Sequence, residues 1–413
     1  MWRLHCSLFL VACASCSTRP PPPPVPVAPA GRWVDGDVHV HSTGGSNDTD
    51  SSSFPADLAA VARTRGLDFL ILTDHSNATG GLGFGDDVEN HPNVGPEFPY
   101  RDTVAALSVP GEFVMLDGNE ISPIESLTTI GRPRGHVGCL PKPGDPFRDA
   151  GTSFAFIDRP PGAIPGGDGV KSCHSIGGFA VINHPFTFAT WTAYDWTSFE
   201  YDAIEVWNGG LEFDAWDLKG MQAWWCDRAL GRTVAPIGAS DCHRAHLDPP
   251  GTLTDPALGV ARTLVFVPEL SAEGVTAGIA AGRTVAHDWV GRLEVWAGLE
   301  GTTSAYLPGD RVKAPAGATL RFHLRGHADR AAQVQVLSVG AGECVDHRTD
   351  ATLGEPEVKP RRDAYALIEQ GDFELTLDVA VEPGRDYAVR LWHPLDDDKF
   401  QRGLALSNAL RVE

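Results

Sequence analysis

Two histidines stand two residues apart near the start of the chain, His39 and His41 in the segment DVHVH at 37–41. Successive side chains of a β-strand point to opposite faces, so residues i and i+2 face the same side. If this segment is a strand, both imidazoles point to one place, as two ligands of a metal ion would. One such pair is also common on surface and core strands, so it predicts a metal site only together with further ligands.

Further ionisable residues recur directly after runs of apolar residues. Short apolar runs of this kind predict strands buried on both faces, as in parallel sheets. The carboxyl ends of parallel strands share one edge of a sheet or one rim of a barrel, where functional sites assemble. His136 stands apart from these groups, between Gly135 and Val137. The groups are Asp74 and His75 after the run 69–72, Glu120 after 113–116, His184 after 179–182, and Asp241 with His243 after the run around Ile237.

A ring of imidazoles and carboxylates in one cleft costs desolvation energy unless an opposite charge compensates it. Divalent metal ions compensate it directly, and a carboxylate such as Glu120 can bridge two of them. Mixed histidine and carboxylate ligands suit zinc, manganese and iron better than calcium or magnesium. Because coordination lowers the pKa of water to about 7, the expected chemistry is hydrolysis by a metal-activated water. The chain has no G-x-S-x-G motif, so no serine nucleophile is expected.

The elements that must position these residues alternate over residues 33–299. Strand-like runs at 37–41, 69–73, 113–116, 136–140, 179–182, 203–206 and 235–238 are interspersed with helical patterns at 55–65, 101–107 and 214–230. This alternation predicts an α/β fold with a parallel sheet, open or closed into a barrel. Residues 300–413 instead predict a small antiparallel β-sandwich-like domain. Its short strands of alternating polarity are expected at 319–324, 332–337, 373–379, 387–392 and 409–412.

The first residues predict export and a lipid anchor. Residues 1–16 carry Arg3, an apolar stretch too short to span a bilayer, and small residues before Cys13 and Cys16. Leu10 three residues before Cys13 resembles a bacterial lipobox, whereas Cys16 gives a signal of more ordinary length without that leucine. A plain secretory signal is the alternative. Residues 17–32 are rich in proline and predict a stiff tether, so we expect a periplasmic or cell-surface lipoprotein.

Composition narrows the function classes. The chain has 413 residues, 42% of them apolar, a formal net charge of −21 and a pI near 5.0. Because phosphate backbones are bound by basic surfaces, the charge argues against nucleic acid as the main partner. Five cysteines follow residue 16 without a C-x-x-C pair, so one or two disulfides are expected in an oxidising compartment. Their odd number leaves at least one thiol unpaired or intermolecular.

The ordered motifs resemble the PHP superfamily of polymerase and histidinol phosphatase domains. They are D-x-H-x-H, T-D-H, a glutamate after the third strand, a lone histidine, N-H-P and D-x-H. Finer segments, GLDF at 66–69, IEVWNG at 204–209 and GRTV at 282–285, are similar to its CehA/McbA-type metallohydrolase branch. The resemblance covers about residues 33–295. It implies a distorted (βα)7 PHP-type barrel with two or three ions of zinc, manganese or iron.

Carried over residue by residue, the resemblance implies a set of metal ligands. An Asp shortly after H-x-H completes it, and Asp48 is preferred there over Asp50. Asp74 and Asp37 are expected to orient histidines, with turn formation at the strand ends as the alternative. His246 is a candidate for protonating the leaving group, beside a metal-bound water. The implied ligands are His39, His41, Asp48, His75, Glu120, His136, His184, Asp241 and His243.

Three functions compete at this stage. The resemblance favours a phosphoesterase acting on a small phosphomonoester or phosphodiester. A carboxylic or carbamate ester hydrolase keeps the same metals and changes the bond. The third candidate is a surface lipoprotein that binds a glycan or a protein partner and carries a degenerate barrel. The completeness of the ligand set argues against that last function.

Overall fold

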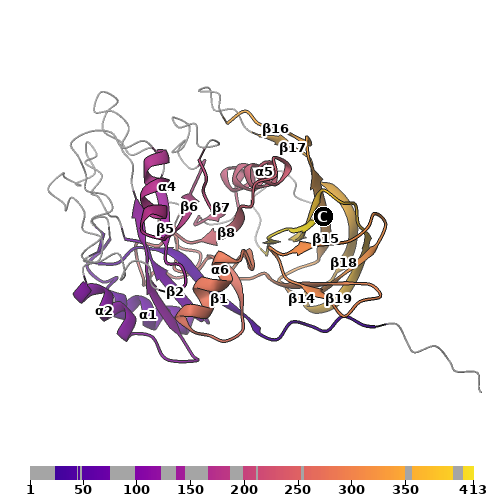
Figure 1. Cartoon of the computed structure of the whole chain (residues 1–413). Coiled ribbons are helices and arrows are strands. Elements are labelled where there is room, and N and C mark those ends of the chain that lie inside the picture. The colour runs from indigo at the N-terminus through magenta and orange to yellow at the C-terminus, as the bar shows by residue number, and fades with distance from the viewer. Residues whose placement is uncertain are drawn as a thin grey trace, which may run out of the picture.

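The structure is a computed structural model of the whole chain (Figure 1). Most elements lie within one residue or two of the positions expected from sequence, because their apolar patterns are strong. The described residues are 24–43, 45–46, 49–74, 98–121, 136–144, 166–186, 199–210, 213–252, 255–348, 356–393 and 403–413.

Two sheets build the first part of the chain. One contains β1, β2 and β3 in parallel, with β9 antiparallel to β1 and β10 antiparallel to β9. The other has the order β4-β5-β6-β7-β8. The strands are β1 (Arg32–Val40), β2 (Phe69–Leu72), β3 (Val114–Asp117), β4 (Asn119–Ile121), β5 (His136–Leu140), β6 (Phe179–Asn183), β7 (Ala203–Asn208), β8 (Ala235–Ala239), β9 (Ala261–Val267) and β10 (Thr284–Asp288).

The two sheets meet at both edges. Gly118 alone separates β3 from β4, and Glu120 N donates to Asp74 O at 3.0 Å. At the other edge, the chain after β8 pairs with the end of β1, where Asp241 N donates to His39 O at 2.9 Å. The expected parallel arrangement is therefore only partly correct, because β4 and β5 pair antiparallel with their neighbours.

Among the described residues, helices are few. Pro55 occupies the first turn of α1, where the missing N–H costs nothing. In α5, Asp214 and Asp217 form a capping box that satisfies backbone donors at both residues. The expected barrel of seven βα units stays a prediction. The helices are α1 (Pro55–Thr64), α2 (Phe98–Ala106), α4 (Gly166–Ser175), α5 (Ala215–Ala229) and α6 (Ala272–Ala280).

The C-terminal part is built of antiparallel strands, as the alternating pattern predicts. One sheet has the order β12-β11-β14-β19, and it faces a layer in which β15 pairs with β18 and β20. Apolar residues such as Phe322 and Val389 fill the space between the layers. Its strands are β11 (Arg292–Leu299), β12 (Ala305–Tyr306), β13 (Arg311–Val312), β14 (Thr319–Ala328), β15 (Ala332–Gly340), β16 (Cys344–Val345), β17 (Glu357–Val358), β18 (Arg361–Ile368), β19 (Gly371–Ala380), β20 (Arg385–Trp392), β21 (Ala405–Ser407) and β22 (Leu410–Val412).

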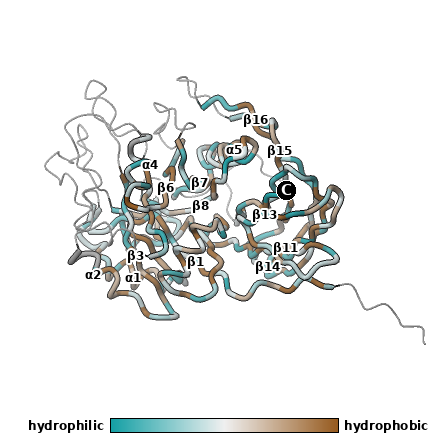
Figure 2. Tube along the Cα trace, viewed as in Figure 1, coloured by the Kyte–Doolittle hydropathy of each residue, from teal (hydrophilic) through white to brown (hydrophobic). Residues whose placement is uncertain are grey.

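The two parts are joined through their backbone. β21 pairs with β10, so the layer of β20 and β22 continues into the sheet that holds β1. Strand β11 precedes the expected domain boundary near residue 300 yet pairs with β14. Figure 2 shows apolar residues concentrated along the inner strands of both parts. Pro26, from the expected tether, lies against Gly298 of β11, and Figure 1 shows this segment running along the lower edge.

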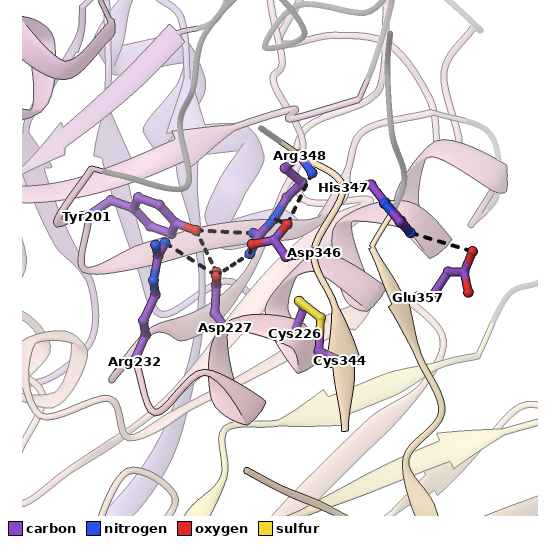
Figure 3. Close-up of a disulfide and its surroundings, with 9 residues drawn as sticks. All are labelled: Tyr201, Cys226, Asp227, Arg232, Cys344, Asp346, His347, Arg348 and Glu357. Atoms are coloured by element: carbon purple, nitrogen blue, oxygen red, sulfur yellow. Dashed lines mark hydrogen bonds and ion pairs between the residues drawn. A yellow bond between two sulfur atoms is a disulfide. The ribbon is translucent and has the colours of Figure 1, made fainter. Parts of the chain in front are cut away.

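A disulfide and a buried ion pair also connect the parts (Figure 3). Cys226 of α5 is bonded to Cys344 of β16. Beside it, Arg348 donates to Asp227 at 2.7 Å, and both side chains are fully buried. A second disulfide joins Cys139 to Cys173, and Cys242 is a buried free thiol. The expectation of one or two disulfides with an unpaired cysteine is confirmed for the described residues.

In the described part of the chain, no helix combines the length and the apolar character needed to cross a membrane. The expected signal peptide and both candidate lipidation sites, Cys13 and Cys16, lie outside the described residues.

Candidate metal centre

His39 and His41 end strand β1 with both rings buried and facing the same side. Their exposed fractions are 1% and 0%. The Nε2 atoms lie 3.1 Å apart, which follows from their i and i+2 positions on a strand. Two imidazole nitrogens this close to each other could bind the same metal ion.

Glu120 in β4 lies at the centre of the cluster. Its Oε1 is 3.0 Å from His39 Nε2, 3.0 Å from His136 Nδ1 and 3.3 Å from His184 Nε2. Its Oε2 is 3.6 Å from His41 Nε2. The side chain is fully buried and accepts a 2.9 Å hydrogen bond from Asn183 Nδ2. One carboxylate thus reaches four imidazoles, the arrangement expected of a group that bridges two cations.

Asp241 closes the cluster from the segment after β8. Its Oδ1 lies 3.2 Å from both His39 Nε2 and His41 Nε2. The His243 ring stacks on the His41 ring with centroids 4.2 Å apart, and its Nδ1 is 3.9 Å from Asp241 Oδ1. Asp241 and His243 therefore face the same space as the two histidines of β1, as their place after a strand predicts.

Two of these residues have unusual backbone angles. His184 has φ of 30° and Asp241 has φ of 56°. Non-glycine residues rarely adopt positive φ, and such strain concentrates at functional sites. Both residues directly follow a strand, and the turn aims each side chain back toward Glu120 and His39. The backbone is strained at the positions where the side chains converge.

The donor set fits divalent metal ions. In each of four overlapping groups, the potential ligand atoms all lie within 4.8 Å of one another. Imidazole nitrogens and carboxylate oxygens that converge so closely repel through their lone pairs unless a cation or a proton lies between them. The groups are His39, His41 and Glu120; His39, His184 and Asp241; His41, Asp241 and His243; and Glu120, His136 and His184.

The electrostatics of the cluster favour positive charge. Burial by itself lowers the pKa of His39, but Asp241, Glu120 and Glu205 together raise it well above its ordinary value. Burial likewise opposes ionisation of Asp241, yet His39, His41 and His243 hold the pKa of its carboxyl well below its usual range. The charged Asp241 carboxylate therefore attracts either protons on the imidazoles or cations.

Two expected ligands cannot be placed. Asp48 and His75 lie outside the described residues. Asp50, the alternative to Asp48, accepts hydrogen bonds from Ser52 and Ser53, so its carboxylate closes its own turn. The structure brings the other seven expected ligands together.

Asp74 lies beside the cluster and supports it. Its carboxylate accepts from Ser42 N, from Ser42 Oγ at 2.8 Å and from Ser46 Oγ at 3.1 Å. Ser46 Oγ in turn lies 2.9 Å from His41 Nδ1. A Cβ at Gly45 would overlap this carboxylate, so only glycine fits there. The contacts agree with the expectation that Asp74 orients a histidine.

Among the described residues, Asp37 bonds to neighbouring segments rather than to a histidine ring. It accepts from Ser240 and from Gly259 N at 2.8 Å, which ties β1 to the segments after β8 and before β9. Burial raises the pKa of its carboxyl to about 6. Turn and strand-end bonding, the alternative considered from sequence, describes Asp37 better than orientation of a histidine ring.

Sequence reasoning missed Glu205. This β7 residue is 2% exposed, and its Oε1 lies 2.8 Å from His39 Nδ1. Its Oε2 accepts from His184 N at 2.6 Å and from Asn208 Nδ2 at 2.8 Å. A carboxylate on the far nitrogen of a histidine fixes which nitrogen faces a metal. A charged residue inside the apolar run 203–207 was the available signal.

His246 does not join the cluster. Its ring is exposed, and Nε2 lies 3.0 Å from Ser52 O. None of the four ligand groups contains it. The expectation that His246 protonates a leaving group stays a prediction. Its support is its position in the sequence, three residues after His243.

Comparisons with known proteins found distant similarity to solved structures. No family model and no curated protein matches the chain. A two-domain protein from Bacteroides vulgatus, containing a predicted PHP-like metal-dependent phosphoesterase, is 16% identical with a TM-score of 0.42; the match covers 94% of this chain and 98% of that one. Endonuclease Q from Pyrococcus furiosus is 14% identical over 60% of this chain and 56% of its own, with a TM-score of 0.38.

A further structure of endonuclease Q holds a duplex with an abasic lesion at its active site. It is 16% identical over 59% of this chain and 56% of its own, with a TM-score of 0.35. The expectation of a small-molecule ester or phosphoester partner, with no nucleic acid as the main partner, is contradicted by this comparison, because endonucleases are among the matched structures.

Proposed function

We propose that the chain is a metal-dependent hydrolase that cleaves phosphoester bonds. The observation that carries the proposal is Glu120, whose two carboxylate oxygens lie within 3.6 Å of four imidazoles in a buried pocket. The motif resemblance to the PHP superfamily and its CehA/McbA-type branch supports the same activity. Buried ionisable residues in this number and order are typical of a site that holds cations rather than of packing.

Two of the four overlapping ligand groups share Glu120, one with His39 and His41 and the other with His136 and His184. Asp241 belongs to the other two groups, one with His39 and His184 and one with His41 and His243. Zinc, manganese or iron suits such mixed ligands. Divalent ions bound there lower the pKa of water to about 7 and stabilise charge on the ester oxygens.

The protein's own groups prepare this pocket. Glu205 accepts from His39 Nδ1, which leaves the Nε2 lone pair directed at Glu120 and Asp241. Ser46 Oγ, which also contacts the Asp74 carboxylate, likewise contacts His41 Nδ1 and orients that ring. Asn183 fixes the Glu120 carboxylate. Three inner side chains, His39, His41 and Glu120, are thus each oriented by a second polar group, as is typical of metal sites.

Elemental analysis followed by a substrate panel tests the proposal. The purified protein should carry at least one equivalent of zinc, manganese or iron. Metal-loaded protein should hydrolyse nitrophenyl phosphate, bis-nitrophenyl phosphate or a DNA duplex with an abasic lesion, and Glu120→Gln should not. Turnover of nitrophenyl acetate alone would establish the carboxylic ester alternative. Less than one equivalent of metal, with no activity after manganese or zinc is added, would establish the binding-module alternative.

We also propose that the protein is exported and anchored by a lipid at Cys13 or Cys16, followed by the tether 17–32, the catalytic part 33–299 and the β-rich part 300–413. Two disulfides support an oxidising compartment, since such bonds rarely persist in the cytosol. Mass spectrometry of the N-terminal peptide from a membrane fraction identifies the modified cysteine. An unmodified peptide that retains Met1, recovered from the soluble fraction, would refute the anchor.

A further inference from the structure

The outer face of the sheet β12-β11-β14-β19 carries an aromatic patch among charged side chains. Leu293, Val295 and Ala297 of β11 pack in the core of the β-rich part, so the residues that alternate with them face outward. Trp296 is one of these outward residues, and it is half-buried. Its ring stacks on the ring of His323 from β14, with centroids 3.7 Å apart and planes 1° from parallel.

Ion pairs lie on both sides of this stack along the two strands. On one side, Arg325 of β14 is opposite Glu294 of β11 and donates to its carboxylate. On the other side, Arg321 of β14 donates to Asp378 of β19 at 2.7 Å. Burial and the neighbouring Arg321 lower the pKa of His323, so its ring is neutral at pH 7. The stack is therefore an apolar strip between two charged rows.

The proline-rich segment 24–30 reaches this strip. An added Cβ at Gly298 would lie 2.5 Å from both Cβ and Cγ of Pro26 and 3.6 Å from Cζ3 of Trp296. Proline, glycine and indole thus meet at one point. Gly298 is buried although it faces outward, because Pro26 covers it. Figure 1 shows the N-terminal segment passing the sheet of β14 and β19 on its way to β1.

Burial along the segment repeats every three residues. Pro26 and Pro29 are half-buried, whereas the other residues from 24 to 30 are exposed, with Val25 at 71% and Val27 at 70%. A polyproline II helix has three residues per turn, so residues i and i+3 share one face. The sequence PVPVAPA at 24–30 favours this extended conformation. Domains that recognise such helices place them in grooves lined by aromatic side chains.

We propose that Trp296, His323 and Gly298 form a binding site for a polyproline II helix, and that its occupant is this chain's own segment 24–30. The glycine leaves room for the ring of Pro26, and the stacked rings offer it an apolar surface. The segment is then held against the β-rich part instead of acting as a free spacer. The direction in which the N-terminus leaves the molecule is thereby fixed, whether or not the chain carries the proposed lipid anchor.

Spin labelling of the full chain tests this contact. Val27→Cys places a nitroxide at an exposed position between the two half-buried prolines, in a chain whose cysteines before residue 17 are replaced by serine. The label is specific, because Cys242 is buried and the four remaining cysteines form disulfides. The electron spin resonance spectrum reports how freely the segment moves. Oxidation of Trp296 by hydroxyl radicals, followed by mass spectrometry, reports whether the indole is covered.

Two proline variants form a matched pair. Pro26→Ser and Pro24→Ser make the same change two residues apart, once at a half-buried position and once at an exposed one. Gly298→Ala tests the contact from the sheet, because the added Cβ overlaps Pro26 and the glycine lies in a strand without positive φ. We expect Pro26→Ser and Gly298→Ala to remove the immobilised component of the spectrum and to increase Trp296 oxidation several-fold. Pro24→Ser should match the parent chain in both measurements.

Equal spectra for Pro26→Ser and Pro24→Ser would overturn the proposal, as would a freely mobile label in the parent chain. Pro26 lies outside the sheets, so this comparison holds even if Gly298→Ala fails to fold. A second copy of the chain is the alternative occupant. If dilution of the parent chain releases the label, the segment binds a neighbouring molecule and the assignment to its own sheet is wrong.

The site is independent of the reaction proposed for the metal centre. Metal content and hydrolysis should therefore be unchanged in Pro26→Ser. Failure of the hydrolase proposal would leave the spectra as expected, and failure of this site would leave metal binding and turnover intact.

Discussion

At the scale of single residues, two glutamates organise the metal centre in different ways. Glu120 contacts the imidazoles directly, whereas Glu205 contacts the far side of His39 and the backbone of His184. The second role depends on acceptor geometry as well as on charge. Both Glu205 oxygens are used as acceptors, so an amide cannot replace the carboxylate without turning one acceptor into a donor.

Glu205→Gln should therefore weaken metal binding although the residue touches no metal position directly. Groups that orient a ligand from behind typically contribute 10–100-fold, so we expect a loss of roughly that size in metal affinity. Competition with a chromophoric chelator measures it. Glu294→Gln, a carboxylate paired with Arg292 and Arg325 on β11, is the control. Unchanged affinity in Glu205→Gln would show that it does not orient His39.

The buried Asp288 carboxyl, which is not one of the metal ligands, should make the stability of the protein depend on pH. Burial raises the pKa of this carboxyl to about 6, although Gly291 N and Gly403 N donate to it. The folded state thus binds more protons than the unfolded state between about pH 4 and 6. The free energy of unfolding falls as the pH rises through this window, by up to roughly 3 kcal/mol.

Asp288→Asn does not titrate and isolates that effect. Measured by urea unfolding at several pH values, the wild type should lose stability relative to Asp288→Asn between pH 4 and 7. A difference that stays constant over this range would show that the carboxyl titrates normally. The direction of the pH-dependent difference tests the prediction. Its size also includes the loss of the oxygen that accepts from Gly403 N, because an amide has one acceptor oxygen.

At the scale of elements, strand ends and one helix start position the site. Asp217 closes the capping box of α5 and also accepts from Asn208 N at 3.0 Å, at the end of β7. Asn208 in turn donates to Glu205. The first turn of α5 is thereby linked to the carboxylate that holds His39, whereas Asp214 serves the helix alone.

Asp214→Ala and Asp217→Ala separate these two roles. Loss of the Asp214 cap should cost about 1 kcal/mol of unfolding free energy and leave metal affinity unchanged. Asp217→Ala should reduce both, because the end of β7 loses its anchor. Denaturant unfolding and metal titration of both variants check this. Equal metal affinity in the two variants would show that the link from Asp217 through Asn208 to Glu205 does not support metal binding.

At the scale of the whole molecule, the catalytic and β-rich parts are fastened by sheet pairing, by the Cys226–Cys344 disulfide and by the buried pair of Arg348 with Asp227. The disulfide spans 118 residues of sequence, against 34 for Cys139–Cys173. Chain entropy makes the longer closure the more stabilising one.

Replacing Cys226 and Cys344 by serine should cost roughly 2–4 kcal/mol, and about 1 kcal/mol more than the same change at Cys139 and Cys173. Unfolding in urea under non-reducing conditions measures both losses. Metal content should stay at the wild-type level in the Cys226 and Cys344 variant, since the pair lies away from the ligands. An equal loss for the two pairs would contradict the entropic account.

The sequence by itself determined the local features. Apolar runs and alternating patterns located strands β1 to β3, strands β5 to β8 and the main strands of the β-rich part, because strand periodicity is a local property. Ionisable residues directly after those runs identified Glu120, His184 and Asp241 as neighbours, since strand ends meet at one edge, and the spacing of two placed His39 beside His41. An odd number of cysteines after residue 16 predicted at least one thiol that is unpaired or intermolecular, and Cys242 is a free thiol in the structure.

Tertiary structure alone decided what depends on contacts distant in sequence. It placed the Glu205 carboxylate against His39 Nδ1, although the two residues are 166 positions apart, and it paired the Asp50 carboxylate with Ser53 in the same loop. It made the sheets mixed rather than parallel, joined β21 to β10, and paired Cys226 with Cys344. No periodicity encodes these contacts, because each results from how separate elements pack and which buried polar groups then find partners.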